Sequence, residues 1–291
     1  MRTSNGERLF YAVNYIVLAI IACSSLFPLL HLIALSISDP SAVETGKVNL
    51  WPVGLSMETF NLLFKGTPIV HSFLNSVKVT VVGLMLCMVM TICAAYPLSR
   101  PYFYARRWFT LAMIFTMIFS GGLIPSYLIV KSLGLINTYW AIWLPALVST
   151  YNMLVLRTYF EGIPQEIDEA ARMDGCGEYR LLLQIILPVS MPVIATLTLF
   201  YGVAFWNTFM SMLLYINSTD KYNLTVLVQN MIQSQSALQQ SLIVQPDDQS
   251  HIVEEGVKAA GVIVLIVPML LVYPFLQKYF IKGVMIGSVK G

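Results

Sequence analysis

The residues whose types and spacing point to a specific task lie in one short charged segment between two strongly apolar stretches. This segment contains Glu169, Ala170, Ala171, Asp174 and Gly175. Acidic side chains near the start of a helix are stabilised by the helix dipole, and a glycine just after its end can adopt the positive φ that a tight stop requires. The small alanines leave part of this helix nearly bare, which permits another protein's surface to approach closely. We therefore interpret the segment as a handle for mechanical coupling.

The turn-forming residues divide this handle into a bracket of two helices. Pro164 is suited to the first turn of the first helix, and Gly175 is placed to end it. Asp174 is unfavourable at the end of the first helix, but it can cap the amides of a second helix over 177–186. Together these residues predict a coupling loop over 161–192 that lies across the inner surface of a membrane.

The sequence lacks the motifs of the enzyme classes that a membrane protein could belong to. It contains no Gly-x-x-x-x-Gly-Lys-Ser/Thr loop for nucleotide phosphates, no His-Glu-x-x-His and no Gly-x-Ser-x-Gly. The cysteines at 23, 87, 93 and 176 are not spaced for a metal site or a disulfide framework, and we interpret them as small packing residues. We therefore predict no catalytic residues, no metal site and no cofactor held by this chain.

Composition places the chain in a membrane. It is 57% hydrophobic and only 11% charged, with a mean hydropathy of +0.72, whereas soluble domains carry about a quarter charged residues. Stretches without Asp, Glu, Lys or Arg reach the roughly 20 residues that one helical crossing needs. Six transmembrane helices are predicted near 10–37, 73–98, 108–129, 139–159, 193–215 and 257–280.

The basic residues set the expected orientation. With the N-terminus inside, all eight arginines fall on the cytosolic side, whereas the outer side carries lysines only. Both termini are therefore predicted to be cytosolic. The first apolar run is nearly 30 residues long, which favours an uncleaved helix over a secretory signal. Nothing in the near-neutral net charge of +2 points to nucleic-acid binding.

The longer outer segment, about 217–256, is polar and rich in glutamine. Its composition is typical of an exposed loop or of short surface helices. Two interpretations remain open: a flexible linker, or a docking surface for an external partner, because loops on a rigid scaffold often carry contacts.

The charged segment resembles the coupling motif, often called the EAA loop, of type I ABC importer permeases. The resemblance extends to the sequence that ends the second predicted helix (95–100), to 206–209 and to the tail at 277–291, which is similar to that of carbohydrate permeases. Within that group, 120–125 and 134–138 look most like permeases for complex or acidic oligosaccharides. Two positions depart from the usual loop, Cys176 in place of Ala and Leu182 in place of Phe. The residues that carry the motif are Glu169, Ala170, Ala171, Asp174, Gly175, Ile185, Leu187, Pro188 and Pro192.

This resemblance implies a fold and a set of partners. It implies an all-α type I permease, a single transmembrane domain over 1–291 with core helices within 73–280, in the cell membrane of a bacterium. The coupling residues, which dock on a cytosolic ATPase dimer, are then Glu169, Ala170, Ala171, Asp174, Gly175, Leu187 and Pro188. That dimer binds the ATP and Mg²⁺. The further partners implied are a second homologous permease, an extracytoplasmic solute-binding protein, a sugar substrate and membrane lipid.

Candidates for the substrate pathway are polar and aromatic residues spread over several predicted helices. Aromatic faces with amide donors suit sugar rings and hydroxyls. The alternative interpretation is that these residues are interfacial anchors or interhelical hydrogen bonds. The candidates are Asn75, Ser76, Tyr151, Asn152, Trp206 and Asn207.

Three other functions were weighed against import driven by ATP. An ion-coupled secondary transporter needs an ionisable group deep in the membrane, and only His31, toward the outer end of the first helix, qualifies. An intramembrane enzyme lacks its motif. A non-catalytic membrane scaffold would not require so patterned an inner loop.

Overall fold

The computed structural model describes the backbone of residues 5–241 and 253–288, and every regular element in these ranges is a helix. The predicted all-α class is confirmed. The chain divides into two compact units, one of residues 1–70 with 228–268 and the other of residues 71–227 with 269–291. Helices α4, α14 and α15 run from one unit into the other.

The first unit contains one long apolar helix, two short helices and parts of two further helices. The side chain of Asp39 accepts a hydrogen bond from the amide of Ser41 (2.9 Å), which caps the second helix where Pro40 begins it. Buried Ala34 of the long helix packs with Ala42 and Val43 of this second helix in a small hydrophobic core, which holds the two helices together. The elements are α1 (Asn5–Ser36), α2 (Pro40–Glu44), α3 (Glu58–Gly66), most of α14 (Leu224–Ser241) and the first part of α15 (Val253–Ser288).

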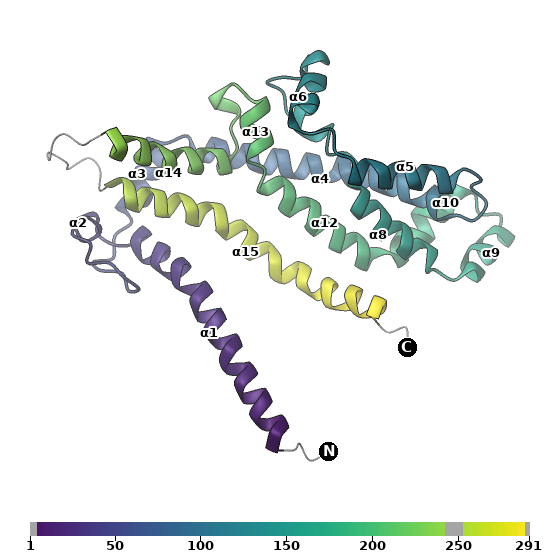
Figure 1. Cartoon of the computed structure of the whole chain (residues 1–291), viewed down its shortest axis with the longest axis horizontal. Coiled ribbons are helices and arrows are strands. Elements are labelled where there is room, and N and C mark those ends of the chain that lie inside the picture. Colours follow the sequence, from purple (N-terminus) through teal and green to yellow (C-terminus); the bar gives the residue numbers. More distant parts are fainter. Residues whose placement is uncertain (1–4, 242–252, 289–291) are drawn as a thin grey trace. The chain divides into compact units, whose positions relative to one another are not determined.

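The second unit contains the remaining helices (Figure 1). Its elements are α4 (Ile69–Ser99), α5 (Arg106–Ile118), α6 (Leu123–Ser132), α7 (Trp140–Trp143), α8 (Thr150–Glu161), α9 (Gln165–Met173), α10 (Glu178–Leu181), a π-helix (Leu182–Ile186), α11 (Leu187–Val189), α12 (Met191–Trp206), α13 (Met210–Tyr215) and a 3₁₀ turn (Thr219–Lys221). Most of them pack around one large core, and Val130 of α6 forms a smaller cluster with Ala141 and Tyr215.

Helix α4 is the spine of this second unit. A Cβ on Gly83 would lie within 2.9 Å of the Phe205 ring of α12, so only glycine allows this close approach. Further along the same pair of helices, about two turns after Gly83 and one turn before Phe205, the hydroxyls of Thr91 and Tyr201 share a hydrogen bond of 2.7 Å. The indole of Trp143 donates to the carbonyl oxygen of Val79 at 3.0 Å. These contacts fix α7 and α12 against α4.

Three described helices are long and apolar enough to cross a bilayer: Gly6–Ser36, Ile69–Ser99 and Glu255–Pro274. Two bent pairs raise the possible number to five, namely Arg106–Ile118 with Leu123–Ser132, and Glu178–Val189 with Met191–Trp206. The prediction of six continuous spans is therefore corrected for the middle of the chain, where the apolar stretches are broken.

The predicted helix over 108–129 is two helices that meet at 113°. The break falls at Phe119–Gly122, where Gly122 has a φ of +83°. This left-handed backbone suits glycine and cannot continue a right-handed helix.

The predicted helices over 139–159 and 193–215 are also interrupted. In the first, Pro145 lies between α7 and α8 and has no amide to donate, and the Ser149 hydroxyl accepts from the Asn152 amide to start α8 afresh. In the second, α12 ends at Trp206, and the side-chain amide of Asn223 donates to the carbonyl oxygen of Thr208 at 2.7 Å. That bond stabilises a backbone carbonyl freed by the break.

The polar segment predicted over 217–256 contains a helix of 18 residues, α14. The beginning of α14 is anchored, because Leu224 and Val226 are buried. Residues 242–252 of the segment lie outside the described residues.

Candidate functional site

The first half of the coupling loop forms the helix that the sequence predicts. Helix α9 runs from Gln165 to Met173, and Gly175 follows with a φ of +74°. The amide of Gly175 donates to the carbonyl oxygen of Arg172 (3.0 Å) and that of Cys176 to Ala171 (2.9 Å), which is the hydrogen-bond pattern of a Schellman stop. Pro164 precedes the helix as its N-cap instead of occupying the first turn.

The second half of the loop differs from the expected helix over 177–186. Helix α10 has only four residues, a π-helix follows it, and α11 meets α12 at an 82° bend near Ser190. Gly177 is the N-cap of α10, with no side-chain cap, so the prediction that Asp174 caps this helix is wrong. Asp174 is instead the C-cap of α9, because the tight stop at Gly175 ends that helix first. Pro188 and the proline at 192 lack amide donors, which prevents a straight α-helix here.

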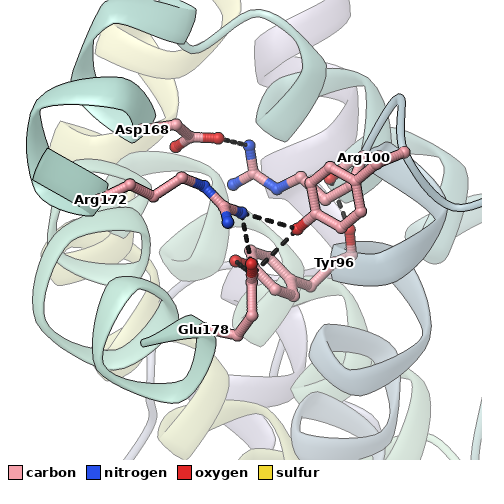
Figure 2. Close-up of polar contacts among 7 residues, drawn as sticks. Tyr96, Arg100, Asp168, Arg172 and Glu178 are labelled. Atoms are coloured by element: carbon pink, nitrogen blue, oxygen red, sulfur yellow. Dashed lines mark hydrogen bonds and ion pairs between the residues drawn. The ribbon is translucent and has the colours of Figure 1, made fainter. Parts of the chain in front are cut away.

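A buried ion pair ties α9 to the C-terminal end of α4. The guanidinium of Arg100, the residue after α4, donates through Nη1 to Oδ2 of Asp168 on α9 (Figure 2). The two side chains are only 6% and 15% exposed. Arg100 also lies over the ring of Tyr96, with 4.6 Å between its Cζ and the ring centroid. The pair therefore joins segments that lie 68 residues apart in the sequence.

A second point of attachment is centred on the carboxylate of Glu178, the first residue of α10. The hydroxyls of Tyr96 and Tyr102 donate to its Oε2 at 2.8 and 2.9 Å, and the Arg172 guanidinium of α9 donates to its Oε1. Arg172 also lies 5.2 Å from the centroid of the Tyr102 ring. Figure 2 shows this second group beside the Arg100–Asp168 pair. We call the two groups together, Tyr96, Arg100, Tyr102, Asp168, Arg172 and Glu178, the inner joint.

The electrostatics of the inner joint favour its hydrogen bonds. Burial raises the pKa of Tyr102 above its ordinary value, and the hydrogen bond to the negatively charged Glu178 raises it further, against the opposing charges of Arg172 and Arg100. The phenol therefore stays protonated and remains a donor at neutral pH. A cavity of about 390 Å³ lies beside the joint, and its wall includes Arg100, Asp168 and Arg172.

The structure places the predicted coupling residues on two sides of α9. Glu169 and Ala170 are exposed, as are Asp174 and Gly175, and Met173 beside them is 88% exposed. Ala171 is buried in the chain's own core, so only one of the two alanines is open to another protein. Beyond the bracket, Leu187 is half-buried and Pro188 is exposed.

Sequence reasoning did not nominate the inner joint as a site. Arg100 entered only as one of the arginines predicted to be cytosolic and as the end of the resemblance over 95–100, and Asp168 was not proposed as a site residue. A signal was present in one helix: Asp168 and Arg172 are four residues apart, so they lie on one face of α9.

The predicted pathway residues do not share one environment. Asn75 is buried, and its side-chain amide donates to the backbone oxygens of Asp220 and Tyr222 at 2.8 and 3.0 Å. Trp206 is buried edge-to-face against Phe73.

The other pathway candidates lie elsewhere in the second unit. Asn152 is buried in the first turn of α8, whereas Tyr151 beside it is 56% exposed and Asn207 is exposed at the end of α12. The hydroxyl of Ser76 accepts from the Leu224 amide. Asn75 and Ser76 thus make structural hydrogen bonds, which leaves Tyr151 and Asn207 as the accessible candidates.

Comparison with known proteins gives a consistent set of similarities. Residues 6–286 match the family described as "Binding-protein-dependent transport system inner membrane component". The chain is 39% identical, over 98% of its length and 99% of the relative's, to the polygalacturonan/rhamnogalacturonan transport system permease protein YtcP of Bacillus subtilis (strain 168). It is 36% identical to Protein LplC of the same organism, over 100% of this chain and 98% of that protein.

A solved structure is similar over nearly the whole chain. It belongs to a bacterial ABC transporter involved in the import of the acidic polysaccharide alginate, and the match has a TM-score of 0.87 at 30% identity, covering 96% of this chain and 99% of the other.

Proposed function

We propose that this chain, which belongs to the family of binding-protein-dependent transport system inner membrane components and is a permease subunit of an ABC importer, carries a complex acidic oligosaccharide across a bacterial cell membrane. The observation that carries this proposal is the pairing of 39% identity to a polygalacturonan/rhamnogalacturonan permease with a TM-score of 0.87 to an alginate importer. The description of each of these proteins names a polymer that contains acidic sugars.

The permease works within a larger assembly. The sequence contains no loop for nucleotide phosphates, so an ATPase dimer that binds ATP and Mg²⁺ supplies the energy from the cytosol. A second homologous permease completes the pathway, and an extracytoplasmic solute-binding protein delivers the sugar. The family description, which names transport that depends on a binding protein, supports this set of partners.

The exposed side of α9 is the part that docks on the ATPase. Glu169 supplies charge there, Ala170 permits close approach, and Met173 supplies an apolar contact, with its side chain 88% exposed. This role requires the coupling loop and both termini to lie in the cytosol. The concentration of arginines on that side supports the orientation.

Sidedness is tested by thiol labelling. With the cysteines at 23, 87 and 93 replaced, the half-buried Cys176 is expected to react with a membrane-impermeant maleimide only in inside-out vesicles. The control is Thr219→Cys, placed on the outer segment in a background that also lacks Cys176, which is expected to react only in right-side-out vesicles. Labelling of Cys176 from the exterior would overturn the orientation and the coupling role with it.

The substrate class is tested by uptake in the native cell. Deletion of the gene for this chain is expected to abolish uptake of labelled trigalacturonate, and plasmid-borne expression is expected to restore it. Uptake of labelled maltotriose serves as the neutral comparison and is expected to be unchanged. Undiminished trigalacturonate uptake in the deletion strain, together with lost maltotriose uptake, would refute an acidic substrate while leaving the importer assignment intact.

A further inference from the structure

The inner joint holds α9 at two separate points. Asp168 and Arg172 lie one helical turn apart on α9 and face different partners. Asp168 meets Arg100 at the end of α4, and Arg172 meets Glu178 and Tyr102. A helix held at one point can pivot about that contact, whereas two contacts separated by a turn also restrict its rotation. The arrangement therefore defines the angle of α9 as well as its position.

Both points of attachment lead back to the same end of α4. Arg100 follows the last residue of α4, Tyr96 lies one turn earlier, and Tyr102 lies in the loop immediately after it. Tyr96 takes part in both points, since its ring lies under the Arg100 guanidinium and its hydroxyl donates to Glu178. The contacts of α9 and α10 therefore reach the last turn of α4 directly through Tyr96, and the residues that follow this turn through Arg100 and Tyr102.

Stability alone is a poor explanation for this chemistry. A buried ion pair must offset the cost of removing two charges from water, and well-packed apolar residues often stabilise a protein as much or more. The Arg100–Asp168 pair is only partly satisfied, because Nε and Nη2 of Arg100 and Oδ1 of Asp168 are buried without a hydrogen-bond partner among the described residues. Charged contacts are directional, so the ion pair fixes the relative geometry of α9 and the end of α4 even where it adds little stability.

We propose that the inner joint is the element that transmits movement of the coupling segment to α4, with Arg100, Asp168, Arg172 and Glu178 as positioning residues. The inference rests on the proposed docking of α9 to the ATPase, but it does not depend on which sugar is carried. When the ATPase moves α9, the joint keeps α9 and the C-terminal end of α4 together, so that the spine of the second unit moves with it.

The test uses hydrogen exchange measured by mass spectrometry on the complete transporter in nanodiscs. The variant is Asp168→Asn with Glu178→Gln, which removes the negative charge of the carboxylate at each point while preserving side-chain size. The matched control is Glu161→Gln, because Glu161 is also an ion-paired glutamate of the inner side but its partner, Arg157, lies on the same helix α8. In the double variant, amides of α9 are expected to exchange at least 10-fold faster, with α8 unchanged.

Transmission is measured as the change in exchange of α4 when the complex is trapped with ATP, Mg²⁺ and vanadate. The wild type and Glu161→Gln are expected to show this change. The double variant is expected to lose at least four-fifths of it, although the ATPase still co-purifies and its basal hydrolysis stays within about 2-fold. No sugar is needed, so failure of trigalacturonate uptake bears on the substrate proposal alone.

Each outcome decides the inference. Unchanged protection of α9 in the double variant would show that the joint does not hold it, and faster exchange of α9 with an intact response of α4 would show that the force takes another route. If the double variant does not assemble, Tyr102→Phe replaces it, since it removes only the hydroxyl that joins Glu178 and Arg172. Its control is Tyr104→Phe at a fully exposed neighbouring tyrosine, and the same two results overturn the inference.

Discussion

Replacement of Gly175 tests whether the stop at the end of α9 sets the geometry of the coupling segment. Gly175 has a φ of +74°, and a Cβ built there meets nothing within 4 Å. The cost of a side chain is therefore conformational, not steric. For a residue with a Cβ, the left-handed region costs about 1–2 kcal/mol, which corresponds to a roughly 5- to 30-fold change in a local opening equilibrium.

The series Gly175→Asn, Gly175→Ala and Gly175→Val separates this cause from others. Asparagine tolerates positive φ, alanine does not, and the β-branched valine is the least compatible. We expect α9 amides to exchange progressively faster in that order, by about 5- to 10-fold for alanine and more for valine. Gly66→Ala is the control, since this glycine also has open space but no positive φ, and it is expected to leave α9 unchanged.

The functional assay is ATP-driven uptake by the reconstituted transporter, measured per ATP hydrolysed. The ratio is expected to fall in the same order as α9 protection is lost. If valine at 175 were as well protected and as active as glycine, the argument that a left-handed residue holds the bracket would be refuted.

Three further predictions concern other contacts of the second unit. Asp168→Asn alone is expected to destabilise the complex by about 3 kcal/mol, because it leaves Arg100 buried and unpaired, and adding Arg100→Gln is expected to restore part of that loss; additive losses in thermal unfolding would contradict coupling of the pair. Gly83→Ala is expected to destabilise the protein by about 1–3 kcal/mol through overlap with the Phe205 ring. Gly202→Ala is expected to be tolerated, because its Cβ would lie 3.5 Å from Leu84. Equal melting temperatures of the two variants would count against the close packing of α4 on α12. Asn137→Ala is expected to cost about 2 kcal/mol of stability, because it removes the side-chain hydrogen bonds to Asn217 and Ser218 and places alanine at a φ of +62°. Asn137→Gly loses the same hydrogen bonds but tolerates the positive φ. A melting temperature of the glycine variant equal to that of the alanine variant would therefore exclude the backbone contribution.

Several elements were predicted well because their signals are local. The long charge-free stretches that became α1, α4 and α15 needed only length and composition to be identified as helices. The stop at Gly175 was predicted because its cause, a residue that tolerates positive φ after a helical run, is contained in a few neighbouring positions.

The interrupted helices were missed because hydropathy measures composition and not direction. The stretch of 108–130 around Gly122 carries no charged residue, so a hydropathy window cannot distinguish a straight helix from two that meet at 113°. The same holds for the break at Pro145, where α7 and α8 were expected to be one helix.

The sequence by itself determined that this chain lies in a membrane, that it is helical, and that a charged bracket interrupts its apolar stretches, because these properties follow from composition and short-range backbone preferences. Only the tertiary structure decided which residues hold that bracket. Asp168 lies 68 residues after Arg100, and Glu178 lies 82 residues after Tyr96. Local sequence patterns do not indicate that residues so far apart in the chain meet in space. Only folding places α9 beside the end of α4, where Asp168 pairs with the buried guanidinium of Arg100.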